Sequence, residues 1–266
     1  MQPARPAILL PPPQRILAAS LFSRYWFDQA TIHSVLESRQ AGQIFVDDAD
    51  HPRSALLAHA SGECYLGGIP TAAVRACAVY LAETMPPPGR KYLRFIPGDA
   101  VWEQAIAADF ADQAQISPRR SFAFLPSNPI AAPALPPGFR IQPIDAESAR
   151  QVNAAGEITR LWTSIDHFLH HGFGVCAMFE AQCACWMWSW TIGLGRVEIS
   201  VATRPEFRRR GLAASVGRAF LAESARRNLI PTWTCTQSNT PSADLAGKLG
   251  FTENQPYREY ILAGPR

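Results

Sequence analysis

Apolar and polar positions along the chain follow two different spacings, and these spacings divide it into expected helices and strands. In the first half, apolar residues three and four positions apart predict helices over residues 14–37, 71–83 and 101–110. Short apolar runs that end at turn-forming residues predict strands over residues 43–46, 54–59, 63–66, 91–96 and 121–125. This order is typical of an α+β domain built around an antiparallel meander.

The second half has the clearer order of elements. Expected strands cover residues 139–144, 173–179, 183–191, 196–203, 232–236 and 257–262. Expected helices cover residues 146–155, 211–227 and 241–249, and the segment up to residue 172 is helical or irregular. Three consecutive strands joined by short turns form a meander, which is followed by helix, strand, helix and strand.

Five prolines separate the two halves and mark an expected linker. They lie where the apolar periodicity stops, at positions 126, 129, 133, 136 and 137. Proline lacks a backbone N–H donor and holds the chain extended. The sequence therefore predicts a domain over residues 1–125, a linker over residues 126–138 and a second domain over residues 139–266, both of ordinary domain size.

Composition and charge narrow the classes of partner. The 266 residues carry 25 basic and 22 acidic side chains, a net charge of +3, which favours neither a nucleic acid nor a membrane as partner. The six cysteines form no CxxC pair and lie in apolar or strand-like runs, so we expect reduced, mostly buried thiols. The apolar run at residues 8–10 is too short for a signal peptide, and no stretch is long enough to span a membrane. We therefore expect a cytoplasmic protein, and its oligomeric state stays open.

The segment from Arg208 to Ala213 is the strongest local signal. It follows the expected strand 196–203 and opens the expected helix 211–227. A helix N-terminus presents backbone N–H groups that lack intrahelical partners, and the helix dipole adds positive potential there. A small-residue turn at that point predicts a diphosphate site. The alternative interpretation is an arginine-rich, solvated turn before a surface helix.

Two motifs in the second half resemble the GNAT superfamily of acyl-CoA-dependent N-acyltransferases. Its phosphate-loop pattern, Arg/Gln-x-x-Gly-x-Gly/Ala, is matched by Arg208-x-x-Gly211-x-Ala213. The run from Asn239 to Phe251 is similar to the superfamily's late helix and its Gly-Phe exit. A closer resemblance, over nearly the whole chain, is to the subfamily of zwittermicin-resistance-type acetyltransferases. Segments that carry it are 46–48, 54–56, 65–68, 173–174, 198–199, 210–213 and 231–235.

The resemblance implies a fold and a reaction. The C-terminal half is expected to have the GNAT fold, a mixed, mostly antiparallel sheet flanked by helices, after a divergent α+β domain for which a GNAT-like fold is one interpretation. The implied function is N-acetyl transfer from acetyl-CoA, as co-substrate, to a primary amine of a small-molecule acceptor by direct attack. No second phosphate-loop pattern occurs in residues 1–125, so we expect one acyl-CoA site per chain.

In the implied mechanism the acyl-CoA is held mainly by main-chain groups. Its pantetheine lies along residues 201–203 like an added strand, and a free amide there polarises the thioester carbonyl. Backbone N–H groups of residues 210–214 hold the pyrophosphate, and nearby arginines add charge. The expected acyl-CoA-binding residues are Val201, Ala202, Thr203, Arg208, Arg209, Arg210, Gly211, Leu212, Ala213, Ala214, Asn239 and Ser242.

Glu198 is the expected general base, taking the amine proton directly or through a water molecule. The alternative is a glutamate in an ordinary cross-strand ion pair. Ala246 departs from the superfamily, because many GNAT enzymes carry a tyrosine there that protonates the departing thiolate. Water, Ser242 or Tyr257 are then the candidate proton donors, and a non-catalytic acyl-CoA-binding or sensing protein is the alternative function.

Expected contacts to the acceptor are Glu157 and Trp162, because their segment often shapes the acceptor site in this superfamily. The alternating tryptophans of residues 186–190 share one sheet face and either line an apolar pocket or, as we favour, pack beneath a helix. The three histidines of residues 167–171 lack supporting ligands apart from Asp166, so no metal site is expected.

Overall fold

The chain divides into two compact units, each described here by itself. The computed structural model describes residues 6–84, 92–124 and 135–263. The first unit comprises Met1–Arg119 and Pro256–Arg266, and the second comprises Arg120–Gln255. This division differs from the predicted one, because the last strand of the chain belongs to the first unit and residues 120–124 belong to the second. The expected linker over residues 126–138 lies mostly outside the described residues.

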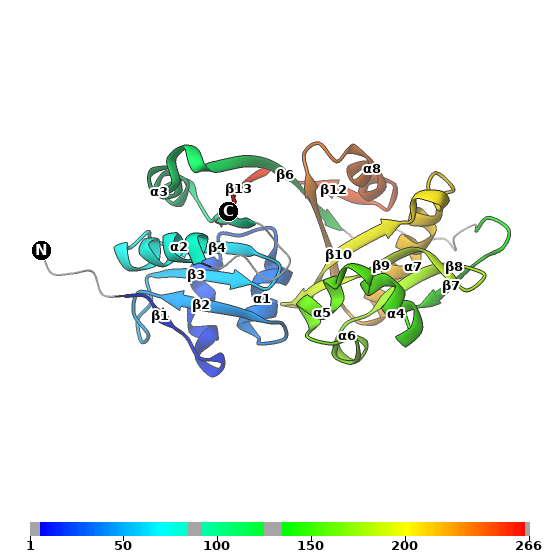
Figure 1. Cartoon of the computed structure of the whole chain (residues 1–266), viewed down its shortest axis with the longest axis horizontal. Helices are drawn as coiled ribbons and strands as arrows, with labels where there is room; N and C mark the ends of the chain where they lie inside the picture. The colour runs from blue at the N-terminus through cyan, green and yellow to red at the C-terminus, as the bar shows by residue number, and fades with distance from the viewer. Residues whose placement is uncertain (1–5, 85–91, 125–134, 264–266) are drawn as a thin grey trace, which may run out of the picture. The chain divides into compact units, whose positions relative to one another are not determined.

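The first unit is built around a mixed sheet in the strand order β1-β2-β3-β4-β5-β13-β6 (Figure 1). Neighbouring strands are antiparallel except β4 and β5, which run parallel. Its elements are β1 (Ile8–Leu9), η1 (Pro12–Phe22), α1 (Gln29–Leu36), β2 (Gly42–Val46), β3 (Ser54–His59), β4 (Glu63–Gly68), α2 (Ala72–Thr84), β5 (Tyr92–Pro97), α3 (Ala100–Phe110), η2 (Ala111–Gln113), the beginning of β6 (Ala114–Phe124) and β13 (Tyr257–Ala263).

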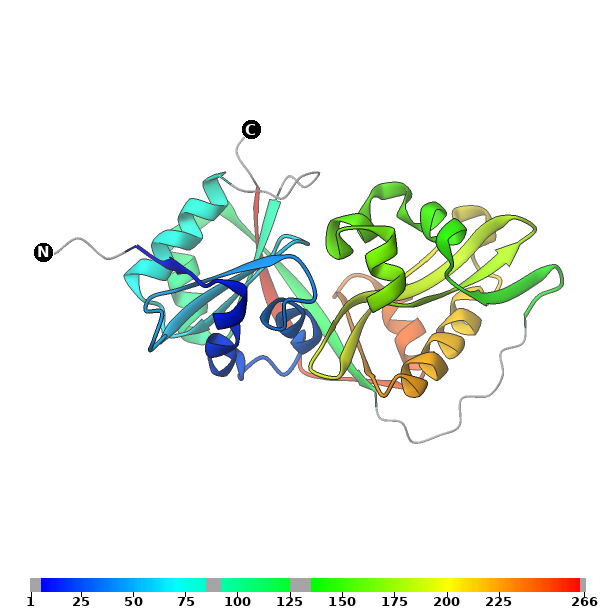
Figure 2. The same cartoon turned by 90° about the horizontal axis from the view of Figure 1, so that it is seen from below.

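This sheet has an apolar core on each face, because successive strand residues point to opposite sides. Leu56 and Leu66 belong to the core cluster formed with α2 and α3. Leu57 and Tyr65 belong to the cluster formed with η1 and α1. Figure 2 shows α2 and α3 on one side of the sheet and η1 and α1 on the other.

The single helix expected over residues 14–37 is two segments in the structure, η1 and α1. Asp28 precedes α1 with a φ of 52°, in the left-handed region, which interrupts a right-handed helix. Its buried carboxylate accepts a hydrogen bond from the Tyr65 hydroxyl at 3.2 Å. The turn therefore depends on a tertiary contact with β4, which the apolar spacing does not encode.

The second unit has the strand order β6-β11-β10-β9-β8-β7, and β12 pairs with β6. Strands β7 to β10 are antiparallel neighbours, and β10 and β11 are parallel. Its further elements are β7 (Phe139–Pro143), α4 (Ala146–Val152), η3 (Asn153–Ala155), α5 (Glu157–Trp162), α6 (Ile165–His171), β8 (Gly174–Phe179), β9 (Gln182–Gly193), β10 (Arg196–Thr203), η4 (Pro205–Phe207), α7 (Leu212–Arg226), β11 (Ile230–Thr236), α8 (Thr240–Lys248) and β12 (Phe251–Glu253).

Helices cover both faces of this second sheet, with α4 to α6 on one face and α7 on the other (Figure 2). On the α7 face, the ring of Phe220 stacks on Phe173 with centroids 4.6 Å apart. On the opposite face, Phe168 of α6 meets Trp188 edge to face at 5.7 Å. The sheet therefore lies between two helical layers. Helix α7, which follows β10 in the chain, packs back onto one face of the sheet.

Candidate active site

The strands β10 and β11 are paired at one end only. β10 pairs with β9 along its whole length, from Arg196 to Thr203. In the described chain its parallel ladder with β11 covers only Arg196–Glu198, opposite Ile230–Thr232, and a register shift against β9 follows between Glu198 and Ile199. The predicted residues Val201, Ala202 and Thr203 thus lie beyond this ladder, on a strand edge suited to hydrogen-bonding an extended ligand.

The predicted phosphate loop leads directly from this edge to the N-terminus of α7. Gly211 precedes the helix with a φ of 78°, and no atom lies within 4 Å of the position that a Cβ there would take. Arg209 is also left-handed, with a φ of 60°. Glycine adopts this conformation without the steric cost that other residues meet, and it leaves the main chain accessible to a ligand.

The N–H groups at this terminus divide into used and available donors. Ala214 donates to the Gly211 carbonyl at 3.1 Å, and Ser215 donates to the same oxygen at 3.2 Å. The N–H groups of Leu212 and Ala213 precede the intrahelical pattern and have no partner within the helix. Of the predicted donors, Ala214 is therefore committed to the helix, whereas Leu212 and Ala213 remain suited to an anion.

The side chains of the three arginines of the loop, Arg208, Arg209 and Arg210, have different surroundings. Arg208 donates from Nε to the Thr203 carbonyl at 3.1 Å, which joins the loop to the end of β10. Arg210 donates to the Glu206 carbonyl at 3.3 Å, and its guanidinium lies 5.7 Å from the centroid of the Phe207 ring. Arg208 and Arg209 line the adjoining cavity, and Arg210 does not. The predicted role of Arg210 at the diphosphate is therefore not supported by its position.

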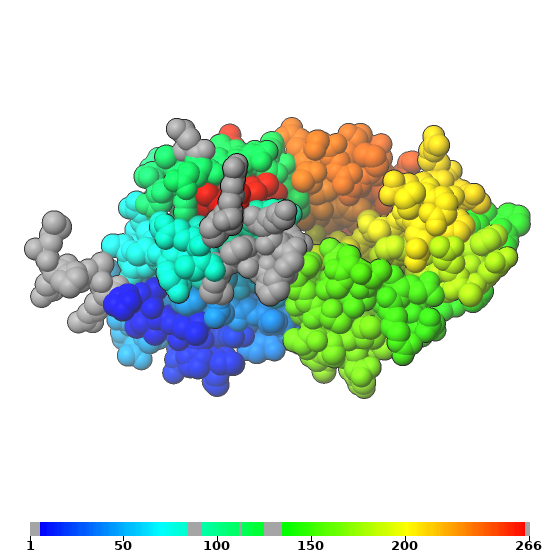
Figure 3. Space-filling view, in the orientation of Figure 1, coloured from blue at the N-terminus to red at the C-terminus, as the bar shows by residue number. Residues whose placement is uncertain are grey.

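A cavity of about 360 Å³ opens at this loop. Figure 3 shows the loop (yellow) and α8 (orange) at the surface of the second unit, with a recess between them. The side chains from α8, which sequence reasoning missed, lie at positions 241, 244, 245 and 248, a spacing that places them on one helix face. The lining residues are Thr203, Phe207, Arg208, Arg209, Gly211, Leu212, Ala213, Ala214, Pro241, Asp244, Leu245 and Lys248.

Asn239 and Ser242, which were predicted to bind acyl-CoA, form hydrogen bonds within the second unit. The Asn239 carboxamide oxygen caps α8 by accepting from the Ser242 N–H at 3.2 Å. The Ser242 hydroxyl accepts from the indole N–H of Trp233 at 3.0 Å. Neither residue lines the cavity at the loop, so their contribution is to fix α8 against β11.

Glu198 lies at the last paired position before β10 and β11 separate. It is 5 % exposed, and its carboxylate accepts from the Thr232 hydroxyl at 2.5 Å. The other oxygen accepts from the N–H and the hydroxyl of Thr234, both at 3.0 Å. These partners are neutral groups of β11, so hydrogen bonds hold the carboxylate across the two strands.

The alternative proton donors have partners of their own. Ser242 lies in the first turn of α8 and is bonded to Trp233. Ala246, later in the same helix, is fully buried. Tyr257 belongs to the first unit, and its hydroxyl accepts from Nε of Arg119 at 3.4 Å. Burial raises the pKa of the Tyr257 phenol well above its usual value.

The predicted acceptor residues lie on α5. Trp162 is fully buried, donates from its indole N–H to the Ser189 carbonyl at 3.1 Å and packs against Phe168. Glu157 lies 3.7 Å from the guanidinium of Arg160. Trp162 is therefore a core residue rather than a pocket wall. Packing also accounts for the buried Trp188 beneath α6, as favoured from the sequence.

Two histidines of α6 lie against main-chain carbonyl oxygens of the same segment. His167 Nδ1 lies 2.6 Å from the Trp162 carbonyl oxygen, and His170 Nδ1 lies 2.7 Å from that of Asp166. Among the described residues, no group of three or more His, Cys, Asp or Glu side chains is arranged to hold a metal ion. None of the six cysteines forms a disulfide, and five of them are buried.

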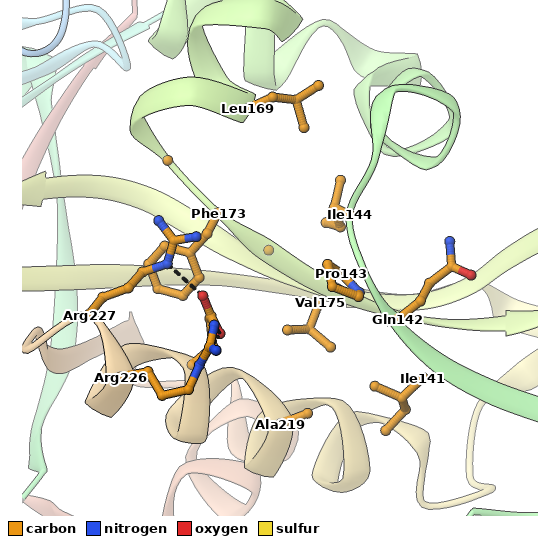
Figure 4. A pocket seen from close by; sticks show the side chains of 13 residues that line it. Ile141, Gln142, Pro143, Ile144, Leu169, Phe173, Val175, Ala219, Arg226 and Arg227 are labelled. Atoms are coloured by element: carbon orange, nitrogen blue, oxygen red, sulfur yellow. Dashed lines mark hydrogen bonds and ion pairs between the residues drawn. The ribbon is translucent and has the colours of Figure 1, made fainter.

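A second cavity, of about 400 Å³, lies at the opposite end of α7 (Figure 4). Its walls are mostly apolar and include Ile144, Leu169 and Val175. Burial disfavours ionisation of Glu223, but hydrogen bonds from Arg227 and Arg226 outweigh it and hold the pKa of this carboxyl below its usual value. A 15-residue helix is about 22 Å long, so this cavity is separate from the phosphate loop.

This geometry defines a class of protein, one with a parallel strand pair that opens toward a glycine-led helix N-terminus. The chain matches the GNAT acetyltransferase family over residues 19–260 and belongs to that family.

Among the described residues, no helix combines the length and the apolar character that crossing a membrane requires.

Individual relatives agree with this assignment. The uncharacterized N-acetyltransferase YdfB of Bacillus subtilis (strain 168) is 25% identical over 234 residues, covering 86% of this chain and 88% of that protein. A GCN5-related N-acetyltransferase-like protein from Streptococcus suis 89/1591 shares the fold, with a TM-score of 0.76, 22% identity and coverage of 94% and 98% of the two chains. A tandem GNAT protein from the clavulanic acid biosynthesis pathway gives a TM-score of 0.65 at 15% identity, covering 98% and 99%. The chain is an acyltransferase of the GNAT class.

Proposed function

We propose that this protein is an N-acetyltransferase that moves an acetyl group from acetyl-CoA to a primary amine of a small molecule by direct attack. The observation that carries the proposal is the opening between β10 and β11, which leads to the Gly211 turn and its cavity. We also propose the zwittermicin-resistance-type subfamily as the closer relationship, supported by the shared segments in both halves of the sequence.

The donor would be bound in two parts. Its pantetheine would extend along residues 201–203 and pair with the edge of β10 that faces away from β9. Its pyrophosphate would lie at the N–H groups of Leu212 and Ala213, where the dipole of α7 favours negative charge. Arg208, Arg209 and Lys248 line the same cavity and supply compensating charge.

The chemistry follows from this arrangement. The amine nitrogen attacks the thioester carbonyl carbon, an amide of β10 stabilises the oxyanion, and the C–S bond then breaks to release the coenzyme A thiolate. Glu198 is the proposed base that takes the amine proton, through water, because its oxygens already accept bonds from Thr232 and Thr234. With Ser242 and Tyr257 bonded elsewhere, water is the proposed proton source for the thiolate, a fair leaving group with a pKa of about 8.5.

A coenzyme A release assay with a panel of primary amines tests the proposal. We expect amine-dependent release of free thiol, formation of the N-acetyl product by mass spectrometry, and loss of both in Gly211→Glu. The matched control is Gly195→Glu in the β9–β10 turn, which has the same left-handed backbone and open surroundings and should retain activity.

Ala246 gives the second candidate function its basis, because a small buried side chain stands where many members of the superfamily carry the acid. Calorimetric binding of acetyl-CoA without thiol release across the whole panel would replace the transferase proposal with an acyl-CoA-binding or sensing role.

A further inference from the structure

The first unit repeats the element order of the second. In the first unit, β1 is followed by two helical segments, β2, β3, β4, α2, β5, α3 and β6. In the second unit, β7 is followed by helices, β8, β9, β10, α7, β11, α8 and β12. In each unit three antiparallel strands precede a helix and a parallel strand, so β4 and β5 correspond to β10 and β11. The first unit therefore has an equivalent of the proposed donor cleft.

The two strand pairs differ at the point where the second pair separates. β4 and β5 stay paired from Glu63–Arg94 through Leu66–Pro97, and Gly98 N–H continues the contact by donating to the Leu66 carbonyl at 3.2 Å. β10 extends five residues beyond its last pair with β11. The equivalent cleft in the first unit is thus closed at the level of the main chain.

Tyr25 completes this closure with its hydroxyl group. The oxygen accepts from the Leu66 N–H at 2.9 Å and lies 2.5 Å from the Ile96 carbonyl oxygen and 2.9 Å from that of Leu66. The side chain is 1 % exposed, and its ring meets Phe27 and Tyr65 edge to face. The Tyr25 hydroxyl therefore already accepts the hydrogen bond from the Leu66 N–H, the main-chain donor that an extended ligand would use on β4.

The turn after β4 is also filled by the protein itself. Three residues, 69–71, join β4 to α2, whereas eight residues, 204–211, join β10 to α7. A Cβ on Gly67 would lie 2.7 Å from the Leu21 carbonyl oxygen, and one on Gly68 would overlap the Arg53 carbonyl oxygen. These glycines admit neighbouring backbone, whereas Gly211 faces open space.

We propose that the first unit is a second copy of the acyltransferase fold whose donor cleft is sealed by Tyr25, so that each chain binds one acyl-CoA, in the second unit. This inference rests on the proposed function. It assigns to Tyr25 a positioning role, because the hydroxyl joins β4 to β5 where a thioester would otherwise lie.

Calorimetry and native mass spectrometry with coenzyme A test the inference on the full chain. We expect one coenzyme A per wild-type chain and an affinity at least about 15-fold lower for Gly211→Glu. Two per chain would overturn the sealed cleft and leave the proposed function intact. No binding to the wild type would overturn the proposed function itself, so the two failures are distinguishable.

Tyr25→Phe provides the second measurement. We expect a lower melting temperature and faster hydrogen exchange at the Leu66 amide, with the stoichiometry and affinity for coenzyme A unchanged. Coenzyme A should slow exchange in residues 199–213 of the wild type and leave the Leu66 amide unaffected. Protection of Leu66 by coenzyme A, or weaker binding in Tyr25→Phe, would show that Tyr25 belongs to a working site and would refute the inference.

Discussion

A glutamate in place of Gly211 tests the phosphate loop most directly. The φ of 78° at this residue costs a non-glycine side chain about 1 to 2 kcal/mol of stability. The side chain itself meets no obstacle, since no atom lies within 4 Å of its Cβ position. The variant should therefore fold, with a modest decrease in melting temperature.

The effect on binding follows from charge. At a separation of about 5 Å and an effective dielectric constant of about 20 to 80, two unit charges repel by about 0.8 to 3.3 kcal/mol. A pyrophosphate carries two charges near the new carboxylate, which doubles the repulsion to about 1.7 to 6.6 kcal/mol. At 1.4 kcal/mol per tenfold change, the affinity for coenzyme A should fall by at least about 15-fold.

Two further variants separate strain from charge. Gly195→Glu places the same side chain at a φ of 64°, also in open space, but in the β9–β10 turn. It should lose comparable stability and keep its affinity for coenzyme A. Gly211→Ala carries the strain at the loop without the charge and should bind more tightly than Gly211→Glu. Equal affinity of Gly211→Glu and Gly195→Glu in calorimetry would refute the assignment of the loop as the diphosphate site.

Three other measurements address the catalytic residue, the first unit and the thiols. Glu198→Gln should lower kcat by about 100-fold or more and leave the affinity for coenzyme A unchanged; a normal kcat would make Glu198 purely structural. Burial of Glu63 disfavours its ionised form, but the charges of Arg94 and His59 and a hydrogen bond from Ser61 have the larger, opposite effect and hold its pKa below 4.5. The ionised carboxylate therefore stabilises the folded state above that pH, and this stabilisation is lost as the pH falls through the lower folded-state pKa. Melting temperatures from pH 7 to 3 should therefore fall less steeply in Glu63→Gln, and parallel curves would contradict this. Burial raises the pKa of Cys64 to about 12 and that of Cys185 to about 11, so these thiols should react with a thiol reagent at pH 8 only after unfolding.

Elements with a strong local pattern were predicted closely from the sequence. β3 and β10 have the predicted bounds, 54–59 and 196–203, because each is a short apolar run between turn residues. β1 and β12 were missed, since two or three residues give no period to detect. β6 begins seven residues earlier than predicted, at Ala114, in a polar stretch that is strand-like only because it pairs with β13.

The placement of β13 in the first unit shows why the domain division was not predictable. The segment 257–262 was expected as a strand and is one, but its partners are β5 and β6, more than 130 residues earlier. A hydrophobic period identifies a strand and the face it buries, and it contains no information about which edge the strand joins. The ion pairs of Glu259 with Arg94 and Arg119, which lie within the first unit, are equally non-local.

The candidate site likewise has one part that local sequence predicts and another part that depends on non-local contacts. The turn at Gly211 could be predicted because diphosphate binding by a helix N-terminus needs only main-chain donors and a permissive residue, both encoded within six positions. The acceptor side depends on side chains brought together by packing, and there Trp162, chosen from the sequence, is a buried residue with a structural partner. Conversely, Lys248 lines the loop cavity from α8, although it was not among the residues of the Asn239–Phe251 run predicted to bind acyl-CoA. The left-handed turn and the open helix N-terminus are therefore readable from local sequence, whereas the side chains around them depend on tertiary structure, and acceptor specificity is best sought by varying side chains around the open edge of β10.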